Sequence, residues 1–500
     1  MKRIPFSIND SILSTRLKCA PGLTRQRFAE RSSDVPAGSN SVTATDTGTV
    51  LAFDDREYTL AELDALTSGM ATALEHRGVR PGDRVAIMSS NRPEFVVALR
   101  AIWGLGAVAV LVSPAWKTAE VAHVLALTEP SHAVGDHDVL ASQMSMLHLD
   151  DPITPGRRRF DPPDPDGDAL FVFSSGTTGL PKAVRHTHRG FAAAIDHWRD
   201  ALGFTHTDRM QIMTPPSHIL GLLNIAMVLD TGAWMRLHRR FDIDTMLRHI
   251  ESDRITIEMA VAPIALALAA HPDLGRYDLS SLRYVMWCAT PVTCAVAETV
   301  AERAGVRWLT AYGTTELPVI ACNPVDATHI DTVGTPVRGV DVRIGDDGEI
   351  QVKSDSVMAG YLPSDATAGA FCDGWYRTGD IGYLDDDGYL RITDRSKEMV
   401  KVRGFQVAPA EIEAVLHGHP AVSDCAVYGV ADAADGEVVV AAVATSSAVS
   451  AEELIDLVGE RLASYKRPSR VEFVTEIPRL PSGKVLRRVL KERHGRSSDV

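Results

Sequence analysis

The chain has few cysteines, and their spacing suits neither a metal site nor a disulfide framework. The six cysteines among 500 residues are widely separated and include no C-x-x-C pair. Structural zinc sites and disulfide-stapled domains need closely spaced cysteines, so neither is expected. Free thiols are typical of proteins from a reducing compartment, which predicts a cytoplasmic protein.

The sequence also lacks a hydrophobic run long enough to cross a bilayer. A spanning helix needs about 20 apolar residues, whereas the longest apolar run here, residues 101–112, is interrupted by Gly104 and Gly106. This run is better interpreted as a buried helix, a turn and a strand. The first residues include two basic side chains but no sustained apolar stretch, so they do not resemble a signal peptide. No membrane span is predicted.

An excess of positive charge is missing as well. The chain has 51 Lys and Arg against 65 Asp and Glu, a formal net charge of −14. Nucleic-acid binding needs a basic face, so no nucleic-acid partner is expected. Hydrophobic residues make up 45% and charged residues 23% of the chain. This balance is typical of a globular protein, with a length that suits about two to four domains.

Helix-like and strand-like segments alternate along most of the chain. Thr59 and Glu62 form a capping box at the start of a predicted helix, and residues 84–88 follow as a short buried strand. Such alternation predicts an α/β fold with largely parallel sheets flanked by helices.

The domain organisation follows from changes in composition. Residues 1–45 are polar and aperiodic, which indicates a loosely held arm. Residues 46–395 are predicted to form a large N-terminal domain of mixed sheets flanked by helices. Residues 396–500, which begin in a densely charged stretch, are predicted to form a small, mobile C-terminal α+β domain.

A loop rich in glycine and hydroxyl groups follows the predicted strand 169–173. Its glycines expose backbone N–H groups and its lysine adds positive charge, a combination that suits a polyphosphate. It is not a Walker A loop, because Pro181 stands where the second glycine should be and Ala183 where a Mg²⁺-binding hydroxyl should be. The phosphate-binding candidates in this loop are Ser174, Ser175, Gly176, Thr177, Thr178, Gly179 and Lys182.

Further polar motifs follow at residues 312–316, 374–380, 394–406 and 481–484. The Glu316 carboxylate, beside hydroxyl groups, suits a Mg²⁺ that carries phosphate oxygens. Asp380 could accept both hydroxyls of a ribose, and Lys484 lies on a tight glycine turn near the C terminus. Each motif alone also fits a charged surface loop. The evidence for a functional site is therefore the occurrence of all of these motifs in this order.

In this order the motifs resemble those of the adenylate-forming superfamily, which includes acyl-CoA and aryl-CoA synthetases, peptide-synthetase adenylation domains and luciferase. The resemblance extends over about residues 50–490, and residues 406–413 are most similar to the 4-coumarate and fatty acyl-CoA ligase branches. It implies an ATP- and Mg²⁺-dependent acid–thiol ligase. A carboxylic acid would become an acyl-adenylate, with release of pyrophosphate, and then a thioester, with release of AMP.

The resemblance also implies a role for each motif residue. Lys484 is similar to the catalytic lysine between the substrate carboxylate and the α-phosphate. Two anions about 4 Å apart repel by about 4 kcal/mol at an effective dielectric constant near 20, and a bridging ammonium offsets that repulsion. Rotation of the small domain at Lys397 would then bring in Lys401, Gly404 and Gln406 for the thiol step. Besides the loop and Glu316, the implied nucleotide-binding residues are Thr290, Thr310, Ala311, Tyr312, Gly313, Thr314, Thr315, Asp380, Ile392 and Arg395.

His218 resembles a ligase histidine at the mouth of the acyl pocket. Amino-acid-activating relatives have an aspartate there, so His218 argues against an amino acid substrate. Trp287 and Cys288, with Ala311 where glycine is common, add side-chain volume and predict a shortened pocket, unless Trp287 packs outward. Pro318 completes the expected pocket. The expected substrate is a short- or medium-chain acid or a small substituted carboxylic acid.

Several points stay open from sequence alone. Coenzyme A is the expected thiol acceptor, with the phosphopantetheine thiol of an acyl carrier protein as the alternative. Ala183 and Asp394 replace glycines that are frequent in the family, and neither change removes a functional group. His186 and His188 form an H-x-H pair, but no third ligand is nearby in sequence, so a metal site is not expected there. The oligomeric state is not readable.

Overall fold

The structure, a computed structural model, describes most of the chain from Gly48 onward, all within the compact unit Thr47–Val500. The predicted arm, residues 1–45, lies outside the described residues. The described ranges are 48–175, 181–288, 294–395, 398–402, 405–432, 436–462, 464–479 and 484–494.

The first large sheet has seven strands. Its order is β18 (Gly360–Leu362), β8 (Pro181–Thr187), β7 (Asp168–Ser175), β4 (Val108–Val112), β3 (Arg84–Met88), β5 (His132–Gly135) and β6 (Met146–His148). The strands from β7 to β6 are parallel, whereas β8 and β18 add on antiparallel. This sheet therefore ends in an antiparallel edge that carries the predicted phosphate loop.

The second large sheet has nine strands. Its order is β15 (Thr335–Pro336), β14 (Ala321–Cys322), β13 (Trp308–Tyr312), β12 (Tyr284–Trp287), β11 (Ile257–Ala260), β9 (Arg209–Ile212), β10 (Trp234–Leu237), β1 (Thr49–Phe53) and β2 (Arg56–Thr59). The strands from β13 to β1 are parallel, and both edges are antiparallel. Parallel sheets of this kind are covered by helices on both faces, which explains their nearly continuous apolar strands.

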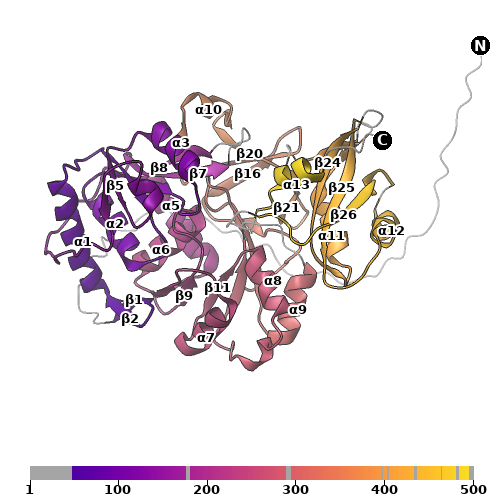
Figure 1. Cartoon of the computed structure of the whole chain (residues 1–500), viewed down its shortest axis with the longest axis horizontal. Coiled ribbons are helices and arrows are strands. Elements are labelled where there is room, and N and C mark those ends of the chain that lie inside the picture. The colour runs from indigo at the N-terminus through magenta and orange to yellow at the C-terminus, as the bar shows by residue number, and fades with distance from the viewer. Residues whose placement is uncertain are drawn as a thin grey trace, which may run out of the picture. The chain divides into compact units, whose positions relative to one another are not determined.

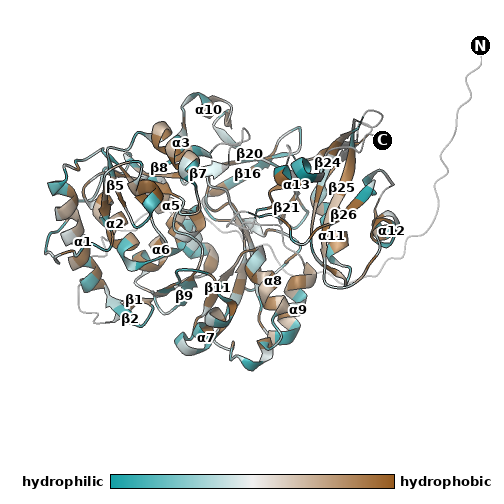
Figure 2. Ribbon diagram, viewed as in Figure 1, coloured by the Kyte–Doolittle hydropathy of each residue, from teal (hydrophilic) through white to brown (hydrophobic). Residues whose placement is uncertain are grey.

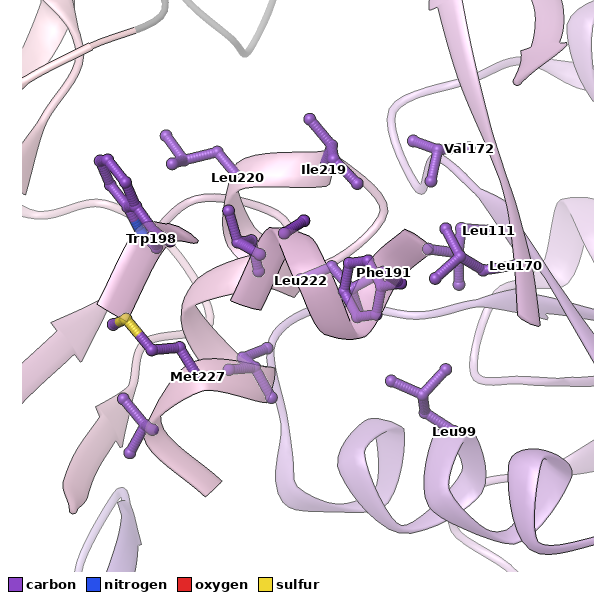
Figure 3. Packing of buried hydrophobic residues seen from close by; sticks show 14 of the residues in the cluster. Leu99, Leu111, Leu170, Val172, Phe191, Trp198, Ile219, Leu220, Leu222 and Met227 are labelled. Carbon is purple, nitrogen blue, oxygen red and sulfur yellow. The ribbon is translucent and has the colours of Figure 1, made fainter. Parts of the chain in front are cut away.

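Helices fill the space between the two large sheets and form the main hydrophobic core. Helices α1 (Leu60–His76), α2 (Pro93–Gly104), α5 (His188–Leu202) and α6 (Ile219–Thr231) contribute side chains to one cluster with strands of both sheets. Figure 3 shows part of it, where Leu99, Phe191 and Leu222 from three helices lie near Leu111 and Leu170 of the first sheet.

Other helices cover the outer faces of the sheets (Figure 1). Helix α3 (Thr118–Thr128) and the short α4 (Asp138–Ala141) join a separate cluster with the first sheet. Helices α7 (Ile243–Asp253), α8 (Ala262–Ala270) and α9 (Cys294–Ala304), with the 3-10 turn η1 (Leu274–Arg276), pack on the second. Each large sheet is thus buried on both faces.

The third sheet departs from the expected parallel arrangement. It contains β16 (Val340–Ile344), β17 (Glu349–Ser354), β20 (Trp375–Leu384), β19 (Phe371–Cys372) and β21 (Leu390–Arg395). All of its pairs are antiparallel, because short turns rather than crossover helices connect most of these strands. The short helix α10 (Asp365–Ala368) follows β18.

The last part of the chain has its own sheet and core. The sheet comprises β23 (Phe405–Val407), β22 (Val400–Val402), β25 (Gly436–Thr445), β24 (Val422–Asp432) and β26 (Arg470–Phe473). Its helices are α11 (Pro409–His417), α12 (Ala451–Arg461), the 3-10 turn η2 (Ser464–Lys466) and α13 (Arg487–His494). Strands β24 and β25 are largely hydrophobic (Figure 2), and their buried side chains form two clusters, one on each face.

The predicted fold class is confirmed: a large mixed α/β part is followed by a smaller α+β part. The capping box is present as predicted, because the Thr59 hydroxyl accepts from the Glu62 backbone and the Glu62 carboxylate accepts from the Thr59 N–H. Residues 101–112 form the end of α2, a turn and β4, as predicted. The domain boundary at residues 395–396 stays a prediction. Among the described residues, no helix combines the length and apolarity that crossing a membrane requires.

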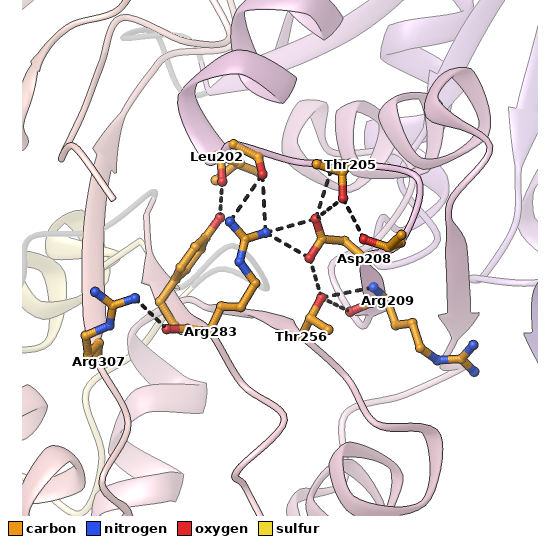
Figure 4. Close-up of polar contacts among 10 residues, drawn as sticks. Leu202, Thr205, Asp208, Arg209, Thr256, Arg283 and Arg307 are labelled. Carbon is orange, nitrogen blue, oxygen red and sulfur yellow. Dashed lines mark hydrogen bonds and ion pairs between the residues drawn. The ribbon is translucent and has the colours of Figure 1, made fainter. Parts of the chain in front are cut away.

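A polar cluster around Asp208 aligns the parallel strands of the second sheet (Figure 4). The Arg283 guanidinium donates to both Asp208 oxygens at 2.8 and 2.9 Å, and the Thr256 hydroxyl donates to one of them at 2.7 Å. Burial raises the pKa of Asp208, but these hydrogen bonds outweigh burial and lower it. Asp208, Thr256 and Arg283 directly precede β9, β11 and β12, so the cluster fixes their starting ends. The opposite ends, where loops in α/β sheets usually bind ligands, carry the predicted site.

A buried carboxyl group lies within the second sheet. Glu258 on β11 is fully buried, and the Gln211 side-chain amide donates to it at 2.6 Å. The Gln211 carbonyl oxygen is bonded in turn to His238 at 2.8 Å. Desolvation raises the pKa of Glu258 to about 8, so its carboxyl group is protonated at pH 7.

This burial predicts a pH-dependent stability that Glu258→Gln removes. The pKa of Glu258 is higher in the folded protein than in the unfolded chain. The contribution of Glu258 to the free energy of unfolding is therefore complete below pH 4.5, and it is lost as the pH rises toward 8. The unfolding free energy of the wild type should fall, relative to Glu258→Gln, by about 1.4 kcal/mol per pH unit between pH 5.5 and 7, and less steeply as the pH approaches 8. His238, with a pKa lowered to about 4 by burial, stays neutral there and does not interfere.

Urea unfolding at several pH values measures this difference. Glu251→Gln is the matched control, because Glu251 is an exposed carboxylate on α7. It should keep the wild-type pH slope. Equal slopes for wild type and Glu258→Gln would contradict the burial argument.

Candidate functional site

The predicted phosphate loop connects two antiparallel strands. Strand β7 ends with Ser174 and Ser175, and β8 begins with Pro181 and Lys182, with Ser174 and Lys182 as direct partners. The hairpin therefore holds Lys182 at the base of the loop. Four of the predicted loop residues lie outside the described residues: Gly176, Thr177, Thr178 and Gly179.

A tyrosine joins the loop lysine to the predicted metal ligand. Strand β18 pairs with β8, and its Tyr361 hydroxyl donates to Glu316 Oε1 at 2.8 Å. The Lys182 ammonium lies 5.7 Å from the centre of the Tyr361 ring. The motifs that contain Lys182 and Glu316 are more than 100 residues apart in sequence, and this contact brings them together. Tyr361 was not among the predicted site residues, because only the pairing of β18 with β8 brings it here.

The segment 312–316 is a tight turn after β13. A Cβ atom at Gly313 would lie only 2.0 Å from the Pro318 carbonyl oxygen, so no other residue fits without moving the backbone. The Thr314 hydroxyl accepts from the Leu317 N–H at 3.0 Å, which closes the turn. Pro318 therefore passes directly against Gly313, on the far side of the turn from β13.

A buried histidine anchors this turn to the phosphate hairpin. His186 on β8 donates from Nε2 to the Thr315 carbonyl oxygen at 2.8 Å. Complete burial lowers the pKa of His186 to about 4, so the ring is neutral at pH 7. Its function is thus to hold the turn, and the H-x-H spacing with His188 reflects a strand followed by the start of α5.

The predicted ribose ligand meets the same turn. The Tyr312 hydroxyl donates to Asp380 Oδ2 at 2.5 Å, and Asp380 is only 3% exposed. Asp380 on β20 pairs directly with Arg395 at the end of β21, whose side chain lies outside the described residues. Ile392 is on the same strand and packs against the main core. The structure thus brings together Tyr312, Asp380 and the backbone of Arg395.

The side chain of Thr310 is directed into the protein. It is 1% exposed, and its hydroxyl donates to the Thr332 carbonyl oxygen at 2.6 Å, so the prediction that Thr310 lines the nucleotide site stays a prediction that can concern only its backbone. Asn323 donates to the same hydroxyl. The side chain of Thr310 therefore supports the sheet from within, whereas its neighbour Ala311 is only partly buried. Thr290 lies outside the described residues.

His218 caps the N terminus of α6. Its Nδ1 accepts from the Leu220 N–H at 3.3 Å, which fixes Nε2 as the protonated nitrogen. Burial lowers the pKa of His218 to about 4, so it is a neutral donor at physiological pH. Ile219 and Leu220, which follow it, belong to the main core. A neutral N–H donor suits an acyl carboxylate or carbonyl oxygen better than an ammonium group.

Trp287 and Cys288 do not share one pocket, contrary to the expectation. Successive residues of a strand point to opposite faces. Cys288 belongs to the main core, whereas Trp287 lies in the cluster under α7–α9, with its ring centre 5.5 Å from that of Trp308. The volume of the Trp287 side chain therefore fills the outer cluster, and it does not shorten a cavity on the side where Cys288 lies.

The predicted thiol-step residues lie on the short hairpin β22–β23. Lys401 and Gln406 are direct partners in it, and their side chains lie outside the described residues. The predicted hinge Lys397 and Gly404 also lie outside them. Lys484 is partly buried, and the next residue, Val485, forms an antiparallel β-bridge with Arg479.

An arginine links the segment after Lys484 to the start of the C-terminal part. Arg487, three residues after Lys484, donates to Glu398 Oε2 and to Glu413 Oε1, both at 2.6 Å. It also donates to the Val427 carbonyl oxygen at 2.8 Å. The side chains of Arg487, Glu398 and Glu413 are 16%, 24% and 13% exposed. These contacts hold the segment after Lys484 against the one just after Lys397.

The predicted Mg²⁺ site rests on Glu316. In the described residues no group of three or more His, Cys, Asp or Glu side chains could enclose a metal ion. Mg²⁺ commonly binds through one or two carboxylates, with water and substrate phosphates as further ligands. The Glu316 carboxylate, oriented through Oε1 by Tyr361 and close to the phosphate hairpin, fits this mode.

The chain is similar to known families and proteins over most of its length. The family described as AMP-binding enzyme matches residues 39–362, and the AMP-binding enzyme C-terminal domain matches residues 411–484. The 4-coumarate–CoA ligase 2 of Nicotiana tabacum is 35% identical over 481 residues, which cover 87% of this chain and 89% of that protein. A Rhodococcus jostii CoA ligase for a methyl-dioxo-octahydroindenyl propanoic acid is 34% identical, and the match covers 89% of this chain and 95% of that protein.

A solved structure is similar as well. The o-succinylbenzoate CoA synthetase of Bacillus subtilis, in complex with its acyl-adenylate intermediate, superposes with a TM-score of 0.82 at 30% identity. The match covers 90% of this chain and 96% of that chain. The chain belongs to the AMP-binding enzyme family. The sequence-based prediction of an adenylate-forming enzyme of the acid–thiol ligase class is confirmed.

The Arg487 contacts predict a large loss of stability on Arg487→Met. The substitution leaves two largely buried carboxylates without their cation, which typically costs about 3–5 kcal/mol. Arg488→Met is the matched control, because the neighbouring Arg488 is 77% exposed and pairs only with Glu492 on its own helix among the described residues. It should change stability by less than about 0.5 kcal/mol. Hydrogen exchange of β24 and α11 measures both effects, and equal protection in the two variants would contradict the proposed link.

Proposed function

We propose that this protein activates a small carboxylic acid as its acyl-adenylate and transfers the acyl group to coenzyme A. The observation that carries the proposal is the meeting of Lys182 at the base of the phosphate hairpin with Glu316 across Tyr361. A cation and a carboxylate beside a loop of glycines and hydroxyls are the groups that bind a magnesium–nucleotide triphosphate.

In the proposed first step, the acid carboxylate attacks the α-phosphorus of ATP and pyrophosphate leaves. Lys182 and the loop N–H groups hold the phosphates, and Asp380 accepts the ribose hydroxyls. Mg²⁺ at Glu316, when bound, neutralises phosphate charge. Lys484 lies between the two reacting anions and offsets their repulsion. Catalysis is then largely positioning and charge neutralisation.

In the proposed second step, the thiol of coenzyme A attacks the acyl carbonyl carbon and AMP leaves. Rotation at Lys397 removes Lys484 and brings Lys401, Gly404 and Gln406 to the acyl-adenylate. Domains 46–395 and 396–500 are the two bodies of this motion. The alternative acceptor is the phosphopantetheine thiol of an acyl carrier protein, which presents the same chemical arm.

The proposed substrate is a small substituted or ring-bearing acid, with short- and medium-chain fatty acids as the next class. Support comes from His218, whose neutral N–H donor suits an acyl oxygen and does not pair with an α-ammonium group. The relatives named above act on coumarate and on a bicyclic propanoic acid. Since Trp287 packs in the outer cluster, it no longer supports a preference for the shortest chains.

The test of the proposal is ATP–pyrophosphate exchange across aromatic, bicyclic, C4–C10, C16 and amino acids. Exchange should be strongest with aromatic or other small substituted acids and weakest with amino acids, because His218 offers no anion for an ammonium group. Coenzyme A and a carrier protein are then added separately to the best acid. A kcat/KM higher for palmitate than for every smaller acid would contradict the substrate class. Thioester on the carrier protein alone would favour the alternative acceptor.

Lys484→Ala separates the two half-reactions. Loss of the bridging ammonium should slow adenylate formation by about 100- to 1000-fold, the usual effect of removing one charge-stabilising donor. Thioester formation from supplied acyl-adenylate should largely survive, because the lysine is withdrawn in that step. Lys491→Ala, on the exposed side of α13, is the control and should leave both rates unchanged. Equal loss of both half-reactions would rule out the rotation.

A further inference from the structure

The side chain of Tyr361 lies between two opposite charges. Its hydroxyl donates to Glu316 Oε1 at 2.8 Å, and its ring centre is 5.7 Å from the Lys182 ammonium. Glu316 is 8% exposed and Lys182 is partly buried. In the part of the chain that the structure describes, no ion pair joins Lys182 to Glu316. Tyr361 therefore contacts both charged groups, the carboxylate through its hydroxyl and the ammonium through its ring.

Tyr361 is fixed in this place from several sides. Its strand, β18, pairs with β8 so that Tyr361 is opposite Val184, two residues after Lys182. Its backbone N–H donates to the Thr367 hydroxyl at 2.9 Å. Its hydroxyl is also hydrogen-bonded to Tyr376 of β20, which is 4% exposed. Burial raises the pKa of Tyr361 well above its usual value, so the hydroxyl remains protonated and a donor.

The separation matters because a lysine and a carboxylate attract each other strongly where water is scarce. Their Coulomb attraction grows as the separation and the local dielectric constant fall. A direct Lys182–Glu316 pair would occupy the ammonium needed for phosphate and the carboxylate needed for a metal ion. The aromatic face instead stabilises the ammonium weakly, by a cation–π contact that a phosphate easily replaces.

We propose that Tyr361 is a positioning residue that prevents Lys182 and Glu316 from forming an ion pair, so that both remain available to MgATP. The hydroxyl orients the carboxylate through Oε1, and the ring holds the ammonium away from it. This inference rests on the proposed function, because it concerns the same nucleotide site. It adds a residue that none of the sequence motifs contains.

The test is calorimetric binding of ATP to the full-length protein, once with Mg²⁺ and once with EDTA. Tyr361→Phe keeps the ring and loses the hydroxyl. Tyr361→Leu loses both the ring and the hydroxyl. The double variant Tyr361→Leu with Glu316→Gln also removes the carboxylate charge. Tyr383→Phe is the control, because Tyr383 on β20 is 52% exposed and outside the site. Thermal unfolding of each variant identifies any that fails to fold.

Each variant has a distinct expected result. Tyr361→Phe should bind metal-free ATP like the wild type but lose about tenfold of the affinity for MgATP, the effect of one hydrogen bond to a charged group. Tyr361→Leu should also lose about tenfold of the metal-free affinity, because Lys182 then pairs with Glu316. Adding Glu316→Gln should restore metal-free binding by freeing the ammonium. Tyr383→Phe should match the wild type in both conditions.

Contrary outcomes are separable. If the wild type binds MgATP, and if Tyr361→Leu binds metal-free ATP as tightly as the wild type binds metal-free ATP, the inference is wrong and the proposed function stands. If Glu316→Gln fails to restore metal-free binding in a folded Tyr361→Leu background, the ion-pair explanation is also wrong. If the wild type binds no ATP in either condition, the proposed function fails and the inference fails with it.

Discussion

The antiparallel pairing of β8 with both β7 and β18 is the constraint on which the site depends. The pairing of β8 with β7 closes the phosphate hairpin and holds Lys182 opposite Ser174. The pairing of β8 with β18 brings Tyr361 beside the same lysine, and the Tyr361 hydroxyl donates to Glu316. One residue of slip in either pairing would turn these side chains to the opposite face of the sheet. The backbone ladder, rather than any single charged contact, therefore sets the spacing of the charged groups.

Burial of polar groups gives the site its second property, which is a set of neutral donors beside a few retained charges. His186 and His218 are neutral because desolvation lowers their pKa values to about 4. One holds the backbone at Thr315, and the other caps α6 with its Nδ1. Tyrosine hydroxyls donate to Glu316 and Asp380. In a poorly solvated site such preset donors orient the carboxylates before any ligand arrives, which reduces reorganisation on binding.

The two ends of the parallel strands in the nine-stranded sheet have different roles. The starting ends carry contacts that stabilise the sheet, and the carboxyl ends carry residues of the candidate site. At the starting ends of β9, β11 and β12, the Asp208 cluster ties three consecutive parallel neighbours together. Beyond the carboxyl ends of β9 and β13 lie His218 and the segment 312–316, which belong to the candidate site. This division matches the general rule for open α/β sheets, where ligands bind beyond the carboxyl ends of the strands.

The sequence alone determined the class of protein, the fold class and the positions of the local motifs. The capping box at Thr59, the buried segment 101–112 and the glycine–threonine loop depend on neighbouring residues, whose steric and hydrogen-bonding preferences are local. Tertiary structure decided the rest. Whether Trp287 faces the core or the outer cluster depends on strand register, and the hydroxyl of Thr310 is directed inward by its pairing in β13. Tyr361, His186 and Arg487 gain their importance only from partners 45, 129 and 89 residues away, respectively. Such contacts are set by the pairing of distant strands and by buried charge, which no local pattern encodes.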